Sequence, residues 1–225
     1  MSTGGARETN DTARLEAFSD GVFAVAITLL VLELKVPPRD SLTGEHDLLH
    51  ALLDHWPSWF AFITSFLTIL VVWVNHHNVF KAIERSDQVF LLLNGLLLMS
   101  VTVIPFATSL LAEYLEHPQQ RTAAVVYIGS LLLMAITFNF VWKRAMVHNR
   151  LLRADADAGG IWLTTRSFNF GVIVYIVVFV VAFIVPVVSL VCAFLLSVFF
   201  ALPVSASLIG GQSRAAEITR EAGGD

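Results

Sequence analysis

Charged side chains are scarce in this sequence. Asp, Glu, Lys and Arg together make up 14% of the 225 residues, whereas hydrophobic residues make up 56%. Soluble domains usually carry about 25% charged residues, so this composition indicates that the membrane is the solvent of the chain. The net charge of −4 argues against nucleic acid as a partner, because binding phosphates requires clustered Lys and Arg on a soluble surface.

The sequence also lacks the usual signatures of catalysis. The single cysteine, Cys192, lies in an apolar run and excludes a disulfide framework within the chain. There is no glycine-rich phosphate loop after a strand, no His-Glu-x-x-His helix and no Gly-x-Ser-x-Gly elbow. We therefore expect neither enzyme activity nor a cofactor.

Two features of well-known ion channels are missing as well. The sequence contains no Thr-Val-Gly-Tyr-Gly filter, and no apolar run carries Arg at every third position as a voltage sensor does. Any ion selectivity would therefore have to come from side chains on continuous helices.

Long apolar runs, in contrast, are abundant. Six of them are long enough to cross a hydrocarbon core of about 30 Å, which requires about 20 residues; they lie at 17–36, 57–80, 87–112, 122–142, 168–185 and 187–209. Pro186 separates the last two and predicts a tight helical hairpin there. The sequence thus predicts an all-α polytopic membrane protein with six transmembrane helices.

The flanking segments and the basic residues predict the topology. We expect a cytoplasmic N-terminal segment at 1–16, a transmembrane domain at 17–209 and a disordered cytoplasmic tail at 210–225. If the N-terminus lies inside, eleven of the 14 Lys and Arg residues fall in cytoplasmic segments. By the positive-inside rule, the chain is predicted to be a multi-pass protein of the cell membrane with both termini in the cytoplasm.

The outer loop at 37–56 leaves two interpretations open. The spacing of His46 and His50 would place two imidazoles on one helical face, where a metal site is conceivable. Because no third ligand is fixed, the favoured interpretation is an interfacial helix capped by Ser41 or Thr43, with no bound metal. Trp56 and Trp59 follow, where an aromatic belt would anchor the second span.

Polar residues gather where the first span begins and the second span ends. Asp20 lies in the first turn of a span, where the helix dipole stabilises an anion by about 0.3–1 kcal/mol. Two antiparallel spans would bring these polar groups together in a low-dielectric setting. The sequence predicts a structural polar cluster of Arg14, Ser19, Asp20, Trp73, His76, His77 and Asn78.

The first span also carries a stripe of smaller and apolar residues. At 100° per residue the stripe contains Gly21, Val25, Thr28, Leu29 and Leu32, and Asp20 points well away from it. In a monomer such a stripe would be core packing. In a symmetric oligomer it could line an axis, and periodicity alone does not choose between the two.

The string Arg-x-x-x-Phe-Ser-Asp, at Arg14, Phe18, Ser19 and Asp20, resembles the signature of the transmembrane protein 175 family of potassium channels. The resemblance implies a single-repeat, bacterial-type homotetramer in which four copies of the first helix line a central pore. It places a constriction at Val25, a hydroxyl ring at Thr28 and a second apolar ring at Leu32, with Leu29 beside them. Relatives often carry Ile or Leu at the first constriction, so the smaller Val25 implies a slightly wider gate.

The expected function is therefore a passive, potassium-preferring cation channel, with the bilayer and monovalent cations as partners and potassium as the permeant ion. A proton-coupled transporter is an alternative, with Asp20, His76 and His77 as a proton relay. A non-conducting membrane scaffold is the other alternative.

Overall fold

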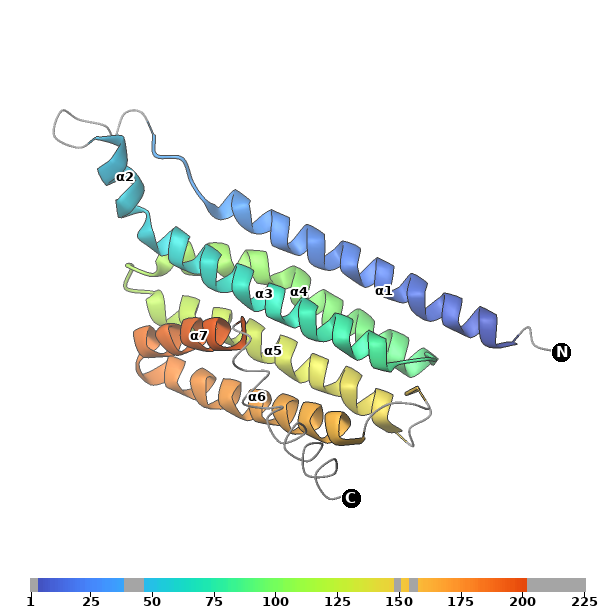
Figure 1. The fold of residues 1–225 in the computed structure, drawn as a ribbon. Coiled ribbons are helices and arrows are strands. Elements are labelled where there is room, and N and C mark those ends of the chain that lie inside the picture. Colours follow the sequence, from blue (N-terminus) through green and yellow to red (C-terminus); the bar gives the residue numbers. More distant parts are fainter. Residues whose placement is uncertain (1–3, 39–46, 148–150, 154–157, 202–225) are drawn as a thin grey trace, which may run out of the picture.

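The structure is a computed structural model that describes residues 4–38, 47–147, 151–153 and 158–201. This part of the chain is helical, and its long helices run along one another in a bundle (Figure 1). The elements are α1 Gly4–Leu29, the 3-10 helix η1 Leu30–Glu33, α2 Leu48–Asp54, α3 Trp56–Ala82, α4 Gln88–Tyr114, α5 Gln120–Met146, α6 Ala158–Ile184 and α7 Pro186–Ala201.

Five of these helices are long and apolar enough to cross a membrane. They correspond to the first five predicted spans. The sixth, α7, has 16 described residues, which at 1.5 Å per residue measure about 24 Å. Its predicted end at 209, like the predicted tail at 210–225, lies outside the described residues.

Two prolines in the spans differ in their effect on the fold. Helix α6 ends at Ile184 and α7 begins at Pro186, which confirms the predicted hairpin. Proline is tolerated at the first position of a helix because its missing N–H would have no intrahelical partner there. Pro105 lies inside α4 without ending it, since α4 continues to Tyr114.

The first helix begins earlier than the sequence predicted. Helix α1 is continuous from Gly4, whereas the apolar run starts at residue 17. No proline precedes Pro37 in the chain, so nothing breaks the helix at the start of the apolar run. The apolar run thus begins inside the helix, and residue 17 stays a prediction of where the membrane-spanning part starts.

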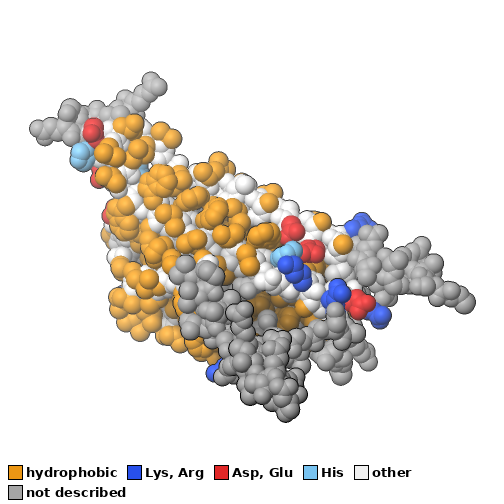
Figure 2. Space-filling view, in the orientation of Figure 1, with side chains coloured by type: hydrophobic (Ala, Val, Ile, Leu, Met, Phe, Trp, Pro, Cys, Tyr) orange, Lys and Arg blue, Asp and Glu red, His pale blue; other side chains and the backbone are white. Residues whose placement is uncertain are grey.

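Two connections meet at the end of the bundle where α3 and α5 end and α4 and α6 begin, which we call the basic end. Ile83 and Leu152 form an antiparallel bridge, and the Arg153 amide donates to the Ala82 carbonyl at 3.0 Å. Lys and Arg side chains gather near this end, while the visible middle of the bundle is mainly hydrophobic (Figure 2). This distribution suits a bundle that lies in a membrane.

An ion pair joins α4 to α5 at the basic end. Asp87 caps α4 by accepting from the Phe90 amide at 2.8 Å, and its carboxylate also pairs with Arg144. The hydrogen bond from Arg144, together with the one from the Phe90 amide, holds the pKa of Asp87 below its usual value. The carboxylate therefore stays ionised and links the start of one helix to the end of another.

Candidate functional site

Helix α1 is held to the bundle by one face only. Phe23, Ala26 and Leu30 are almost fully buried, at 1%, 1% and 0% exposure. Their spacing of three and four residues places them on one helical face, and α1 packs against α3 and α4. The first span is therefore attached to the bundle along one narrow face.

The opposite face of α1 has no partner within the described subunit. Val25 is 57% exposed and Leu32 is 72% exposed, and Thr28, Leu29 and Gly21 are exposed as well. This is the stripe predicted from the sequence. The interpretation of the stripe as core packing within one subunit is therefore wrong, because these side chains point away from the core.

The end of the stripe at Leu32 differs from an ideal α-helix. The periodicity assumed 100° per residue through Leu32, but residues Leu30–Glu33 form a 3-10 helix, which winds more tightly, at three residues per turn. Leu32 remains on the exposed surface despite this change.

Thr28 offers oxygen lone pairs on the exposed face. Its hydroxyl donates to the Val25 carbonyl at 2.9 Å. A hydroxyl has one proton and two acceptor lone pairs, so this bond uses the proton and leaves the oxygen available as an acceptor. Such an oxygen can replace part of the hydration shell of a cation.

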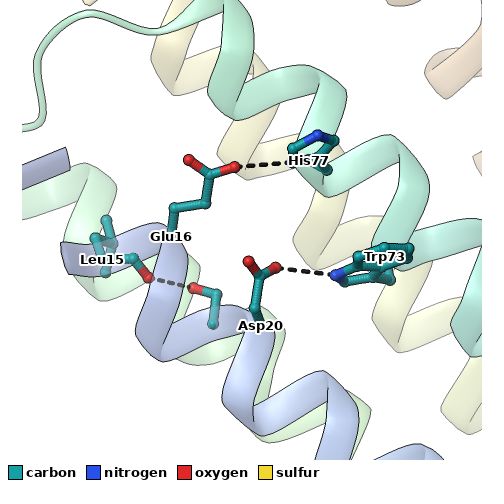
Figure 3. A network of polar contacts seen from close by, with 6 residues as sticks. Leu15, Glu16, Asp20, Trp73 and His77 are labelled. Atoms are coloured by element: carbon teal, nitrogen blue, oxygen red, sulfur yellow. Dashed lines mark hydrogen bonds and ion pairs between the residues drawn. The ribbon is translucent and has the colours of Figure 1, made fainter. Parts of the chain in front are cut away.

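Two polar contacts tie α1 to α3 near the start of the span (Figure 3). The indole N–H of Trp73 donates to Asp20 Oδ1 at 2.9 Å, and Nδ1 of His77 lies 2.9 Å from Glu16 Oε1. The rings of Trp73 and His77 stack with centroids 6.2 Å apart. Glu16 and Asp20 of α1 thus each receive a donor from one face of α3.

A second, fully buried chain of hydrogen bonds connects α1, α3 and α4. The Asn94 amide nitrogen donates to Ser19 Oγ at 3.0 Å, and the Asn94 amide oxygen lies 3.0 Å from Nε2 of His76. Ser19 in turn donates to the Leu15 carbonyl at 2.9 Å. All three hydrogen-bonded side chains, those of Ser19, His76 and Asn94, are 0% exposed.

The orientation of Asn94 fixes the tautomer of His76. Because the amide oxygen faces Nε2, this nitrogen carries the proton. Nδ1 is buried and has no hydrogen-bond partner among the described residues. The ring packs between Phe23 and Phe80, with centroid distances of 5.2 and 4.4 Å. His76 is therefore a neutral, immobilised side chain inside the bundle.

The comparisons with known proteins bear on these helices. The family model described as "Endosomal/lysosomal potassium channel TMEM175" matches residues 14–105. A potassium channel of Chamaesiphon minutus is 50% identical over 197 residues, which are 88% of this chain and 97% of that protein. The chain belongs to the TMEM175 family. Its membership confirms the family predicted from the sequence, which is a family of channels and not of enzymes.

A solved structure and an animal relative extend the comparison. A crystal structure of a lysosomal potassium-selective channel TMEM175 homolog from Chamaesiphon minutus matches with a TM-score of 0.77 and 48% identity, covering 85% of this chain and 97% of that one. An endosomal/lysosomal proton channel TMEM175 of Gallus gallus is 35% identical over 154 residues, which are 65% of this chain and 31% of that protein. The first of these confirms the helical membrane fold.

The TMEM175 match contains the residues that form the side-chain hydrogen bonds of α1 with α3 and α4 described above. Residues 14–105 run from α1 into α4. The matched residues that form these contacts are Glu16, Ser19, Asp20, Trp73, His76, His77 and Asn94. We call these seven residues the polar anchor.

Two residues predicted for the polar cluster are not part of the anchor. Arg14 is exposed and has no hydrogen-bond or ion-pair partner among the described residues. Asn78 is exposed and lines a cavity on another face of α3. It follows His77 by 100° and His76 by 200° around the helix, so it cannot share their contact with α1.

Two residues of the anchor were missed. Glu16 lies four residues before Asp20, so both carboxylates lie on one side of α1. Asn94 is an amide in the middle of an apolar run, and a buried polar group in a span needs a partner. Both signals were present in the sequence, but only a tertiary arrangement shows which residues they meet.

The end of the bundle opposite the basic end departs from one prediction. Helix α2 is capped by Asp47, which accepts from the His50 amide at 2.9 Å, whereas the predicted cap was Ser41 or Thr43. Those two residues and His46 lie outside the described residues. His50 Nδ1 lies 2.7 Å from Asp47 Oδ1. His50 therefore contributes to a local turn at the start of α2.

The predicted aromatic anchors lie at the start of α3. Trp56 and Trp59 are 49% and 41% exposed, and the Trp56 indole donates to Glu116 at 3.0 Å. Nearby, Lys35 forms an ion pair with Glu113. Opposite the basic end, the ends of the first two spans are thus both joined to the end of α4 and the residues just after it.

Proposed function

We propose that the chain is a passive, potassium-preferring cation channel in which four copies of α1 surround a pore. The observation that carries the proposal is the unpartnered stripe of α1, formed by Val25, Thr28, Leu29 and Leu32 on a helix whose other face is firmly anchored. Relatives named potassium channel support the permeant ion. Fourfold symmetry would close the stripe around an axis.

In this proposal the apolar and hydroxyl side chains have separate tasks. Rings of Val25 and Leu32 set the diameter and gate by dewetting. These residues are seven positions apart, which is about 10 Å along a helix. Between them, four Thr28 hydroxyl oxygens coordinate the ion, since their protons are already used by the backbone. No energy source is required for this downhill movement.

The polar anchor has a positioning role in the proposal. It fixes the turn of α1 that precedes the stripe against α3 and α4, so each subunit presents the stripe at a defined angle. The anchor does not form the continuous relay that a proton-coupled transporter would use. Asp20 meets the indole N–H of Trp73, His76 meets Asn94 and His77 meets Glu16, so among the described residues the three groups of that relay do not bond to one another.

The proposed setting is the cell membrane, with both termini in the cytoplasm and the basic end inside. The arrangement of Lys and Arg at one end of the bundle supports this orientation by the positive-inside rule. Lipid contacts the exposed apolar faces of the outer helices. A second candidate, proton conduction through the same pore, is favoured by the name of the chicken relative.

Replacing Thr28 with Val is expected to reduce the potassium-to-sodium permeability ratio by about threefold or more, because it removes the coordinating oxygen and keeps the shape. The measurement is the reversal potential in a planar bilayer with potassium on one side and sodium on the other.

Thr102→Val is the matched control for this change. Thr102 is also exposed on a span and donates to a carbonyl three residues earlier, that of Met99, at 2.8 Å. It lies on α4, outside the proposed pore. Equal permeability ratios for the parent and Thr28→Val would remove Thr28 from the ion pathway, and an equal effect of both variants would point to a general disturbance of the spans.

A further inference from the structure

A cavity of about 400 Å³ lies at the basic end, between α3, α5 and α6. It is separate from the stripe of α1 and from the polar anchor. Its volume is within the usual range of small-molecule sites, about 300–1,000 Å³. The lining residues that carry the argument are Asn75, Asn78 and Lys81 of α3, Trp142 of α5, Arg153 of the following connection and Phe168 of α6.

The wall formed by α3 carries hydrogen-bond donors. Asn75, Asn78 and Lys81 are spaced three residues apart, so they follow one face of the helix. Within the described part of the chain, neither amide has a hydrogen-bond partner. At a membrane boundary such groups require a polar ligand or water. This wall therefore presents two amides and an ammonium group to whatever enters the cavity.

The wall formed by α5 and α6 is largely apolar and rigid. Trp142 is 3% exposed, and its indole donates to Thr165 at 2.9 Å. The ring of Phe168 packs edge-on against it, with centroids 5.8 Å apart. These contacts join α5 to α6 and hold the apolar wall in place. The cavity thus has a polar side and an apolar side.

The described lining residues carry charge of one sign. Lys81 and Arg153 line it, and no described lining residue is acidic. Two cations with neighbouring amide donors suit an anion with several acceptor oxygens, of which phosphate is the most common. An inorganic anion alone would leave the apolar wall without a partner.

We propose that this cavity binds a phosphate-bearing anion, and that the headgroup of an anionic phospholipid supplies it. Lys81 is in the last turn of α3 and the α6 wall belongs to its first three turns, which is the depth of a headgroup. The phosphate meets Lys81, Arg153 and the two amides, and the glycerol and first carbons of the acyl chains meet Phe168 and Trp142. Basic pockets between spans take anionic headgroups in this way.

The site lies on the helix that carries part of the polar anchor. Trp73, His76 and His77 lie on one side of α3, and Asn75 and Asn78 lie on the opposite side. A bound lipid therefore stabilises the helix against which α1 is held. Binding itself does not depend on ion conduction, so it is tested separately from the proposed channel.

The experiment titrates the purified full-length chain, in a neutral detergent, with dioleoylphosphatidylglycerol and measures bound lipid by native mass spectrometry. We expect Lys81→Gln to weaken binding by about fivefold, the effect of one charge near a headgroup. Lys81→Arg is expected to retain binding. Asn78→Leu, which changes no charge, is expected to weaken it as well and serves as an independent variant if Lys81→Gln folds poorly.

The matched control is Lys143→Gln, because Lys143 is also an exposed lysine in the last turn of a helix at the basic end but does not line the cavity. Equal weakening by Lys81→Gln and Lys143→Gln, or equal binding of phosphatidylcholine, would overturn the site. If glycerol 1-phosphate displaces the lipid when both are present at the same concentration, the cavity binds a phosphate-bearing anion, but the proposal that a phospholipid supplies it is overturned.

Discussion

Replacing Val25 with Asn is expected to raise potassium flux by about tenfold, which corresponds to a barrier lowered by about 1.4 kcal/mol. In the proposed pore Val25 forms an apolar constriction that excludes water. An Asn side chain is similar in size to Val, so it leaves the width of the constriction little changed, but its amide holds water there and removes the dewetting barrier. The measurement is potassium flux into liposomes that contain equal amounts of parent and variant protein.

Val177→Asn is the control for this prediction. Val177 is 56% exposed, against 57% for Val25, and it lies on a long apolar span, α6, which packs mainly against α5 and α7. The same polar group is thus introduced at the same exposure but away from the proposed pore. If both variants raise flux equally, the increase reflects leakage through damaged spans, and the assignment of Val25 to the constriction fails.

Replacing Asn94 with Ala is expected to destabilise the protein by about 2 kcal/mol. Asn94 is the shared partner of Ser19 and His76, so its loss leaves two buried polar groups without their hydrogen bonds. Each such bond between spans contributes about 0.6 kcal/mol, up to about 1.7 kcal/mol, and a small cavity adds to the cost. The measurement is the Tm of the purified protein in a mild detergent.

Asn139→Ala is the matched control, because it removes the same atoms at another buried position, which is 5% exposed. Among the described residues, Asn139 has one side-chain partner, Asn169, at 3.0 Å, whereas Asn94 has two. We expect its Tm to fall by about half as much, in proportion to the bonds lost. A fall for Asn94→Ala no larger than that for Asn139→Ala would show that the buried chain from Ser19 to His76 does not fix α1.

The sequence predicted the spans well because their signal is local. An uninterrupted apolar run has one meaning at this length, and Pro186 within the last block predicts a turn without knowledge of any neighbour. The start of α1 at Gly4 was missed because a polar helix that extends beyond the bilayer has no hydropathy signal. The position of a helix end and the position of a membrane boundary are different quantities.

The polar anchor was predicted in part, since the contact between Asp20 and Trp73 is present. The buried bonds of Asn94 to Ser19 and His76 were not predicted. The prediction paired only the first two spans, and Asn94 belongs to the third. Asn78 was placed wrongly since its neighbours in sequence face α1 and it does not. Which face of a helix meets which neighbour is set by tertiary packing, and one sequence does not specify it.

The exposed stripe shows how sequence and structure complement each other. Periodicity placed Val25 and Leu32 on one line but left core packing and an oligomeric axis open. The structure removes the first alternative, because the buried face of α1 is that of Phe23, Ala26 and Leu30. The two faces of one helix thus have separate tasks: one attaches the helix, and the other remains available to line a pore.

The most direct test of the central claim is ion flux through the purified parent protein in liposomes, with potassium, sodium and N-methyl-D-glucamine compared in parallel and a pH-sensitive dye inside. The proposed channel predicts flux that favours potassium, excludes the bulky cation, increases linearly with concentration and needs no proton gradient. Flux that saturates and follows a proton gradient, or no flux at all, would contradict a passive potassium pore built on the first helix.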